Sequence, residues 1–120
     1  MEQMMNYSEM TDFEINKRVA ELIGGFIEED IFEKEQTIFR HHVSGKYSHF
    51  DPCTSWADAG PIIERHMICL AADVFAETQD GGKWVAQPAY GWDSERVRSD
   101  NPLRAAMIVF LMMKEKPDAA

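Results

Sequence analysis

The stretch NPLRAAMIVFL, residues 101–111, decides the fold class of this chain. Asn101 is a favoured helix N-cap and Pro102 stands at the first helical position, so the pair predicts a helix that runs to about Lys114. Apolar side chains cover nearly every side of this helix, and a helix of that kind is normally central to a core. The alternative interpretation is that one side meets a second subunit, as the seam of a homodimer.

Two further helices are predicted upstream. Residues 12–23 have apolar side chains at helical spacing, Thr11 and Glu14 have the spacing of a capping box, and Gly24 with Gly25 ends the pattern. Residues 55–65 carry a shorter apolar stripe. We expect Thr54 to be the N-cap of that helix, and Pro61 to end or kink it.

Several segments are typical of strands and turns. Extended structure is predicted at residues 36–43, 47–50, 67–75 and 83–88. Residues 44–46 are expected to form the turn between 36–43 and 47–50. The segments 67–75 and 83–88 are expected to form a hairpin, because Asp80-Gly81-Gly82 supplies the positive φ that a tight hairpin turn requires. We interpret residues 89–100 as irregular, with Tyr90-Gly91-Trp92 as an anchor. The expected fold is α+β, with a small, mainly antiparallel sheet packed against about three helices in one domain over residues 1–120.

Composition narrows the classes of function. The chain has 120 residues, is 45% hydrophobic, and carries a net charge of −9. A negative field repels phosphate, so direct binding of nucleic acid or of an anionic membrane is disfavoured. The longest apolar run, residues 105–113, is far shorter than the ~20 residues that cross a bilayer. Only two cysteines are present, which favours a reducing, intracellular compartment.

The negative charge is concentrated near the start of the chain. Residues 1–35 hold ten acids and three bases, whereas residues 36–120 hold eleven and nine. The densest part is residues 28–35, named here the acidic segment. Its acids are Glu28, Glu29, Asp30, Glu33 and Glu35, and its apolar neighbours are Phe26, Ile31 and Phe32.

The acidic segment has two interpretations. It is either a solvated face that aids solubility or a contact for a basic partner. In the second case the apolar neighbours are the expected anchors, and in the first they belong to the core. Because the segment lies beyond Gly25 and outside the predicted apolar faces, we expect the fold to tolerate charge reversal at Glu28, Glu29 and Asp30.

Catalytic and metal-binding patterns are weak. His49, Cys53, His66 and Cys69 have the spacing of a structural zinc site, but a helix over residues 55–65 would hold the two pairs about 16 Å apart. Cys53 could act as a nucleophile with His49 as its base, because a thiol near a helix N-terminus has a lowered pKa. Packing of both cysteines as small buried side chains is the favoured alternative. We therefore expect no catalytic residue, no bound metal and no cofactor.

Three motifs together resemble a known family. They are YSEMTDFEINKRVA at residues 7–20, FDPC at 50–53 with ADAGPII at 57–63, and NPLRAAMIVFL at 101–111. This combination resembles the NinX-type family of small proteins carried by lambda-like phages and prophages of enteric bacteria. The resemblance implies a phage accessory protein that acts in the bacterial cytoplasm, and it transfers no catalytic residues.

The function expected from these observations is binding rather than catalysis. We expect a protein that engages a basic surface of a host or defence protein and inhibits or modulates it, for example in a CRISPR or similar complex. The alternatives are a small Cys/His-dependent enzyme or zinc-binding protein, and a structural homodimer.

Overall fold

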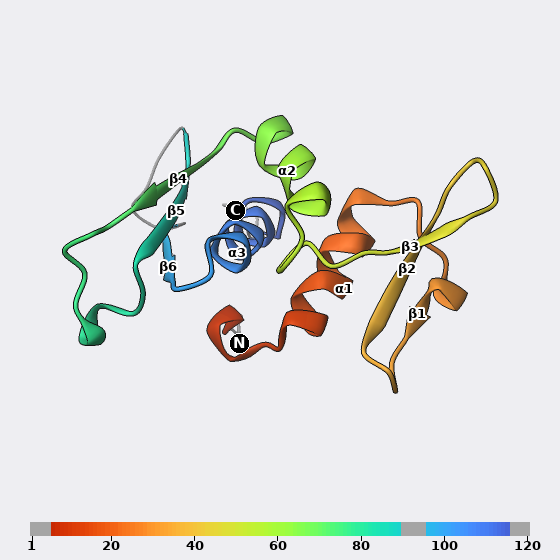
Figure 1. Cartoon of the computed structure of the whole chain (residues 1–120), viewed down its shortest axis with the longest axis horizontal. Coiled ribbons are helices and arrows are strands. Elements are labelled where there is room, and N and C mark those ends of the chain that lie inside the picture. Colours follow the sequence, from red (N-terminus) through yellow and green to blue (C-terminus); the bar gives the residue numbers. More distant parts are fainter. Residues whose placement is uncertain (1–5, 90–95, 116–120) are drawn as a thin grey trace, which may run out of the picture.

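Helix α3 (Pro102–Lys114) lies between the other elements of the computed structural model, which describes residues 6–89 and 96–115 (Figure 1). The side-chain oxygen of Asn101 accepts hydrogen bonds from the backbone N–H groups of Leu103 and Arg104, and Pro102 opens the helix. The predicted bounds are confirmed. Leu103 and residues 105–111 are buried inside this single chain, so the core interpretation accounts for these side chains.

Helix α1 (Asp12–Ile23) also has the predicted bounds. Thr11 Oγ1 accepts from the backbone N–H of Glu14 at 3.1 Å, and Glu14 Oε1 accepts from the backbone N–H of Thr11 at 2.8 Å. These two bonds complete the predicted capping box. The helix ends at Gly24, whose φ of 80° favours glycine.

Helix α2 (Trp56–Arg65) corrects the expected N-cap. Its N-cap is Ser55 rather than Thr54, since Ser55 Oγ accepts from the backbone N–H of Asp58. Pro61 lies inside the helix and does not end it. Proline has no N–H to donate to the carbonyl of Ala57, and the helix continues to Arg65 without that one bond.

The strands form two antiparallel sheets of three strands each, in the orders β1-β2-β3 and β4-β5-β6. Their bounds are β1 Ile31–Phe32, β2 Thr37–His41, β3 Tyr47–His49, β4 Ile68–Ala72, β5 Trp84–Pro88 and β6 Val97–Ser99. The α+β class is confirmed, but the strands do not share the single sheet that we expected. Strand β6 lies in the stretch interpreted as irregular, and Tyr90-Gly91-Trp92 lies outside the described residues.

The predicted hairpin is confirmed in β4 and β5, and its register pairs Ile68 with Pro88 and Ala72 with Trp84. Its connection is longer than a tight turn, because it contains the 3₁₀ turn Thr78–Asp80. Gly81 and Gly82 follow with φ of 98° and 141°, so the predicted positive φ values are present. Gly45 likewise turns β2 into β3 with φ of 88°.

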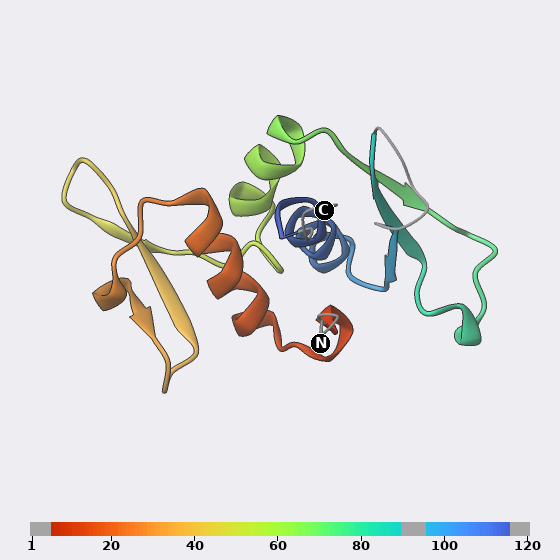
Figure 2. The same ribbon diagram turned by 180° about the vertical axis from the view of Figure 1, so that it is seen from behind.

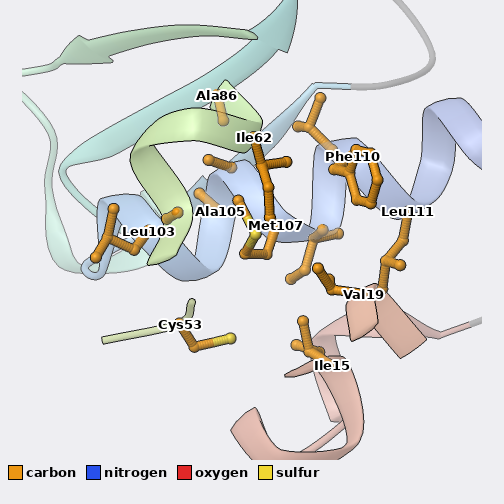
Figure 3. Close-up of a cluster of buried hydrophobic side chains, with 14 of the residues drawn as sticks. Ile15, Val19, Cys53, Ile62, Ala86, Leu103, Ala105, Met107, Phe110 and Leu111 are labelled. Atoms are coloured by element: carbon orange, nitrogen blue, oxygen red, sulfur yellow. The ribbon is translucent and has the colours of Figure 1, made fainter. Parts of the chain in front are cut away.

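The two sheets lie at opposite ends of the molecule, and the three helices lie between them (Figures 1 and 2). Side chains from α1, α2 and β5 meet α3 in the main core, where Ile15 and Val19 approach Met107 and Leu111 (Figure 3). The β1–β3 sheet projects beyond α1, and no helix of the described residues lies over one of its faces. Among the described residues, no helix is long and apolar enough to cross a membrane.

Candidate interaction surface

The uncovered face of the β1–β3 sheet is aromatic. Phe39 pairs with His49, His41 pairs with Tyr47, and Phe32 pairs with Thr37. Paired residues of antiparallel strands point to the same side of the sheet, and so do alternate residues along one strand. One face therefore gathers all six side chains. We name it the aromatic face, and its members are Phe32, Thr37, Phe39, His41, Tyr47 and His49.

The rings on this face contact one another and leave a groove. Phe32 and Phe39 have ring centroids 5.4 Å apart at an interplanar angle of 83°, and Phe39 and Tyr47 have centroids 6.4 Å apart at 84°. Tyr47 is 63% exposed, and Phe32 is 44% exposed. The cavity beside these rings has a volume of about 390 Å³ and is named the aromatic groove. It is lined by Ile27, Glu29, Asp30, Phe32, Phe39, His41 and Tyr47.

The acidic segment borders this groove. Residues 28–30 form a 3₁₀ turn that leads directly into β1, and the turn from β1 to β2 carries the remaining acids. The exposed acids of the segment are Glu28, Glu29, Glu33 and Glu35. Glu33 forms an ion pair with Lys17 of α1. Of the exposed carboxylates, Glu29 lines the aromatic groove, whereas Glu28 and Glu33 line a separate hollow beside α1. The acidic segment and the exposed rings therefore lie next to each other and form an amphipathic surface.

Asp30 differs from the other acids of the segment, and the expectation that it is a solvated charge is wrong. It is only 2% exposed. Its Oδ2 accepts from the backbone N–H of Ile27 at 2.9 Å, and its Oδ1 lies 2.8 Å from Nδ1 of His41. The carboxylate closes the 3₁₀ turn and ties it to β2. Charge reversal there would place a cation against His41, so Asp30 cannot be grouped with Glu28 and Glu29.

The three expected apolar anchors fall on different sides of the sheet. Phe32 lies on the aromatic face. Phe26 and Ile31 are partly buried against the core, and the ring of Phe26 lies 4.8 Å from that of Phe50. Both also line a hollow of about 610 Å³ between α1 and the acidic segment. The core-packing alternative thus describes Phe26 and Ile31, and Phe32 keeps the geometry of an anchor.

The inner face of the same sheet holds a cation against aromatic rings. Arg40 points to this face, and its guanidinium carbon lies 4.7 Å from the ring centroid of Phe50 and 5.6 Å from that of Phe26. A guanidinium over an aromatic face is attracted by the negative charge of the ring face. The guanidinium of Arg40 on the inner face of β2 therefore has its aromatic partners within the same chain.

Comparison with known families matches residues 6–114 to the family described as Bacteriophage P22, NinX. The chain belongs to the NinX family. The match includes the two sheets and the three helices described above. No curated protein and no solved structure matches the NinX-family chain.

The NinX-family chain places the residues with zinc-site spacing on different elements. Cys53 is buried, with Sγ 3.9 Å from the carbonyl oxygen of Asp12, whereas Cys69 is exposed on β4. His49 lies on the aromatic face, and the ring of His66 packs 4.8 Å from that of Phe110. Within residues 6–89 and 96–115, no three His, Cys, Asp or Glu side chains are placed to hold one metal ion.

The environment of Cys53 is opposite to that of an activated thiol. Burial, followed by the negative charge of Asp12, raises the pKa of the Cys53 thiol. The backbone N–H of Cys53 donates to Asn16 Oδ1 at 3.1 Å, and Asn16 Nδ2 donates to Asp51 at 2.8 Å. These contacts give Cys53 and its neighbours a packing role between α1 and α2.

A third cavity of the NinX-family chain, of about 360 Å³, has three cations in its lining. They are Arg40, Arg65 and Lys114, and Asp58 and His66 also line it. Burial, with the charges of Lys114 and Arg65, lowers the pKa of His66. Arg65 and Lys114 lie in the last turns of α2 and α3, where positive charge offsets the negative end of a helix dipole. Interaction with the helix dipoles thus accounts for the positions of Arg65 and Lys114.

Sequence reasoning missed most of the aromatic face. Phe32 was found through its acidic neighbours, but Phe39, His41, Tyr47 and His49 were not. The signal was present in TIFRH and YSH, residues 37–41 and 47–49, where aromatic and histidine side chains alternate with others. Pairing of the two strands is needed to show that both alternations face the same way.

Proposed function

We propose that the NinX-family chain is a non-enzymatic accessory protein that binds a basic surface of a host or defence protein. The exposed acids Glu28, Glu29 and Glu35 supply long-range attraction, and the aromatic face supplies apolar contact. Occupying that basic surface inhibits or modulates the partner. Interference with a CRISPR or similar nucleic-acid-binding defence complex is one form of this function, because carboxylates would lie where phosphates otherwise bind.

The observation that carries this proposal is that exposed rings lie next to the acidic segment. An apolar patch rimmed by polar residues is typical of protein interaction sites, and aromatic residues are enriched at such interfaces. Tyr47 and Phe32 are 63% and 44% exposed beside the acids of residues 28–35. A solvated acidic face alone would not require rings in the same place.

The raised pKa of the Cys53 thiol supports the non-enzymatic reading over a thiol nucleophile. The enclosure of α3 supports binding through the sheet rather than through a dimer seam on that helix. Both considerations favour the surface that the acidic segment and the aromatic face form together.

Affinity capture from an enteric bacterial lysate tests the proposal with two charge-matched variants. The first carries Glu28→Lys, Glu29→Lys and Glu35→Lys in the acidic segment. The second, the control, carries three changes at exposed acids elsewhere: Glu9→Lys, Glu64→Lys and Glu77→Lys. Because both variants alter the net charge equally, only the position of the change differs.

We expect the wild-type chain and the control to retain the same host protein at moderate salt, and the first variant to lose it. Retention of nothing by the wild-type chain contradicts the proposal. Equal loss in both variants also contradicts it, since net charge rather than the acidic segment would then govern capture.

A further inference from the structure

The aromatic groove has the chemistry of a site for an organic cation. Phe39 meets Phe32 at 83° and Tyr47 at 84°, so successive rings stand nearly perpendicular along the groove wall. Perpendicular rings present ring faces as well as edges to the space between them. Ring faces are negative and attract ammonium and guanidinium groups within about 6 Å.

Charge beside the groove favours the same occupant. Glu29 lines the groove, and Glu28 precedes it in the same exposed turn. The carboxylate of Asp30 at the groove is already bonded to Ile27 and His41. Glu29 therefore remains as the groove carboxylate available to a bound cation. A second copy of this chain would bring its own excess of acids, with a net charge of −9, and would be repelled.

The inner face of the sheet shows which cation suits such rings. Arg40 of β2 already lies over Phe50 and Phe26 there, with a guanidinium-to-centroid distance of 4.7 Å to the nearer ring. A planar guanidinium stacks on rings, is weakly hydrated, and can bond a carboxylate with two N–H groups at once. The compact, strongly hydrated ammonium of lysine does none of these as well.

We propose that the aromatic groove binds an arginine side chain presented by the basic partner. Its guanidinium lies against Phe32, Phe39 and Tyr47 and donates to Glu29. The inference rests on the proposed function, because the arginine belongs to the surface that the acidic segment attracts. It adds a residue-level specificity that attraction between opposite charges alone does not provide.

Two peptides of equal charge test this inference. One has four arginines separated by Gly-Ser spacers, and the other has lysine at the same four places. Binding of each to the full chain is measured by isothermal titration calorimetry at low salt. We expect the arginine peptide to bind at least about fivefold more tightly, as stacking on exposed rings provides.

Removal of the rings should abolish this preference. Tyr47→Leu and Phe32→Leu each delete an exposed ring, and we expect both variants to bind the two peptides equally. Phe75→Leu is the matched control, because Phe75 is 88% exposed in the connection between β4 and β5 and is not among the groove residues. Thermal melting of each variant establishes folding, and Phe32→Leu serves alone if Tyr47→Leu does not fold.

Failure of this inference differs from failure of the proposed function. Equal binding of the two peptides by the wild-type chain, or an arginine preference that survives in both ring variants, overturns the arginine site. Capture through Glu28, Glu29 and Glu35 would stand in either case. Conversely, if the variant with Glu28, Glu29 and Glu35 changed to lysine captures the partner as well as the wild-type chain does, the proposed function is contradicted, whatever the peptides show.

Discussion

Oδ1 of Asp30 lies 2.8 Å from Nδ1 of His41, so a buried carboxylate joins the acidic segment to the middle of the projecting sheet. Because a carboxylate only accepts hydrogen bonds, this contact fixes the proton on Nδ1 of His41. The same carboxylate accepts from Ile27, which begins the 3₁₀ turn. One side chain thus holds the turn, β1 and β2 in register, and it determines where the exposed acids stand.

Asp30→Ala should destabilise the protein although Asp30 belongs to an acidic run. The substitution leaves the N–H of Ile27 and the His41 ring without their acceptor, which we expect to cost about 1–3 kcal/mol in the free energy of unfolding. Urea denaturation measures this cost. Glu29→Ala, one residue away and exposed, should change the free energy by less than about 0.5 kcal/mol. Equal effects of the two substitutions would contradict the role assigned to Asp30.

Gly82→Ala should disrupt the β5–β6 end of the second sheet. An added Cβ would lie 2.2 Å from the backbone carbon of Ser99, at a φ of 141° that disfavours other residues. We expect a loss of at least about 3 kcal/mol in the free energy of unfolding. The neighbouring Gly81→Ala meets only the Arg98 side chain, at 3.9 Å, and should cost about 1–2 kcal/mol of backbone strain. Circular dichroism melts of the two variants give the comparison, and the reverse order would refute this account.

Tyr7 should make stability depend on alkaline pH. Burial, followed by the hydrogen bond that its hydroxyl donates to Glu115 at 2.7 Å, raises the pKa of Tyr7 from 10.0 to about 12. A raised folded-state pKa stabilises the fold fully below pH 10, and this contribution falls away as pH rises toward 12.

Tyr7→Phe tests that dependence. It should cost about 0.5–1.5 kcal/mol near neutral pH, through loss of the hydrogen bond to Glu115. The difference from the wild-type chain should shrink above pH 10. Unfolding followed across this range, together with tyrosinate absorbance, measures both effects, and a difference that is constant with pH would contradict them.

The exposed acids should act on the rate of association with the captured partner. The variant with Glu28→Lys, Glu29→Lys and Glu35→Lys should associate at least about tenfold more slowly at low salt and with a weaker dependence on salt concentration. Its melting temperature should stay near that of the wild-type chain, since all three side chains are exposed. Stopped-flow measurements at several salt concentrations provide the readout. An unchanged rate would remove these acids from the interface.

The sequence predicts best those features that depend on neighbours along the chain. The cap of α1 by Thr11 and Glu14 and the start of α3 at Asn101 are local hydrogen-bonding patterns, and both are found where expected. The N-cap of α2 was displaced by one residue, because Thr54 and Ser55 are equally suitable by type. Thr54 Oγ1 instead donates to Asp51, which leaves Ser55 to cap the helix.

Features that depend on distant partners were not predictable in this way. The short strand β6 exists because Val97 and Ser99 pair with β5. Asp30 is buried because its partner His41 arrives from another strand. The aromatic face was only partly found for the same reason, since the pairing of His41 with Tyr47 decides that they share a side.

Successive residues of β2 face opposite sides of the sheet, so packing constrains one set of side chains and solvent or a partner constrains the other. Ile38 and Arg40 pack inward against the core rings, whereas Phe39 and His41 point away from it. Selection for a new partner can therefore act on the outward positions of β2 and β3 other than His41, which holds Asp30, while the helices keep their packing. We expect relatives that meet different host proteins to diverge at the outward positions, and to retain at the inward ones the residues on which folding depends.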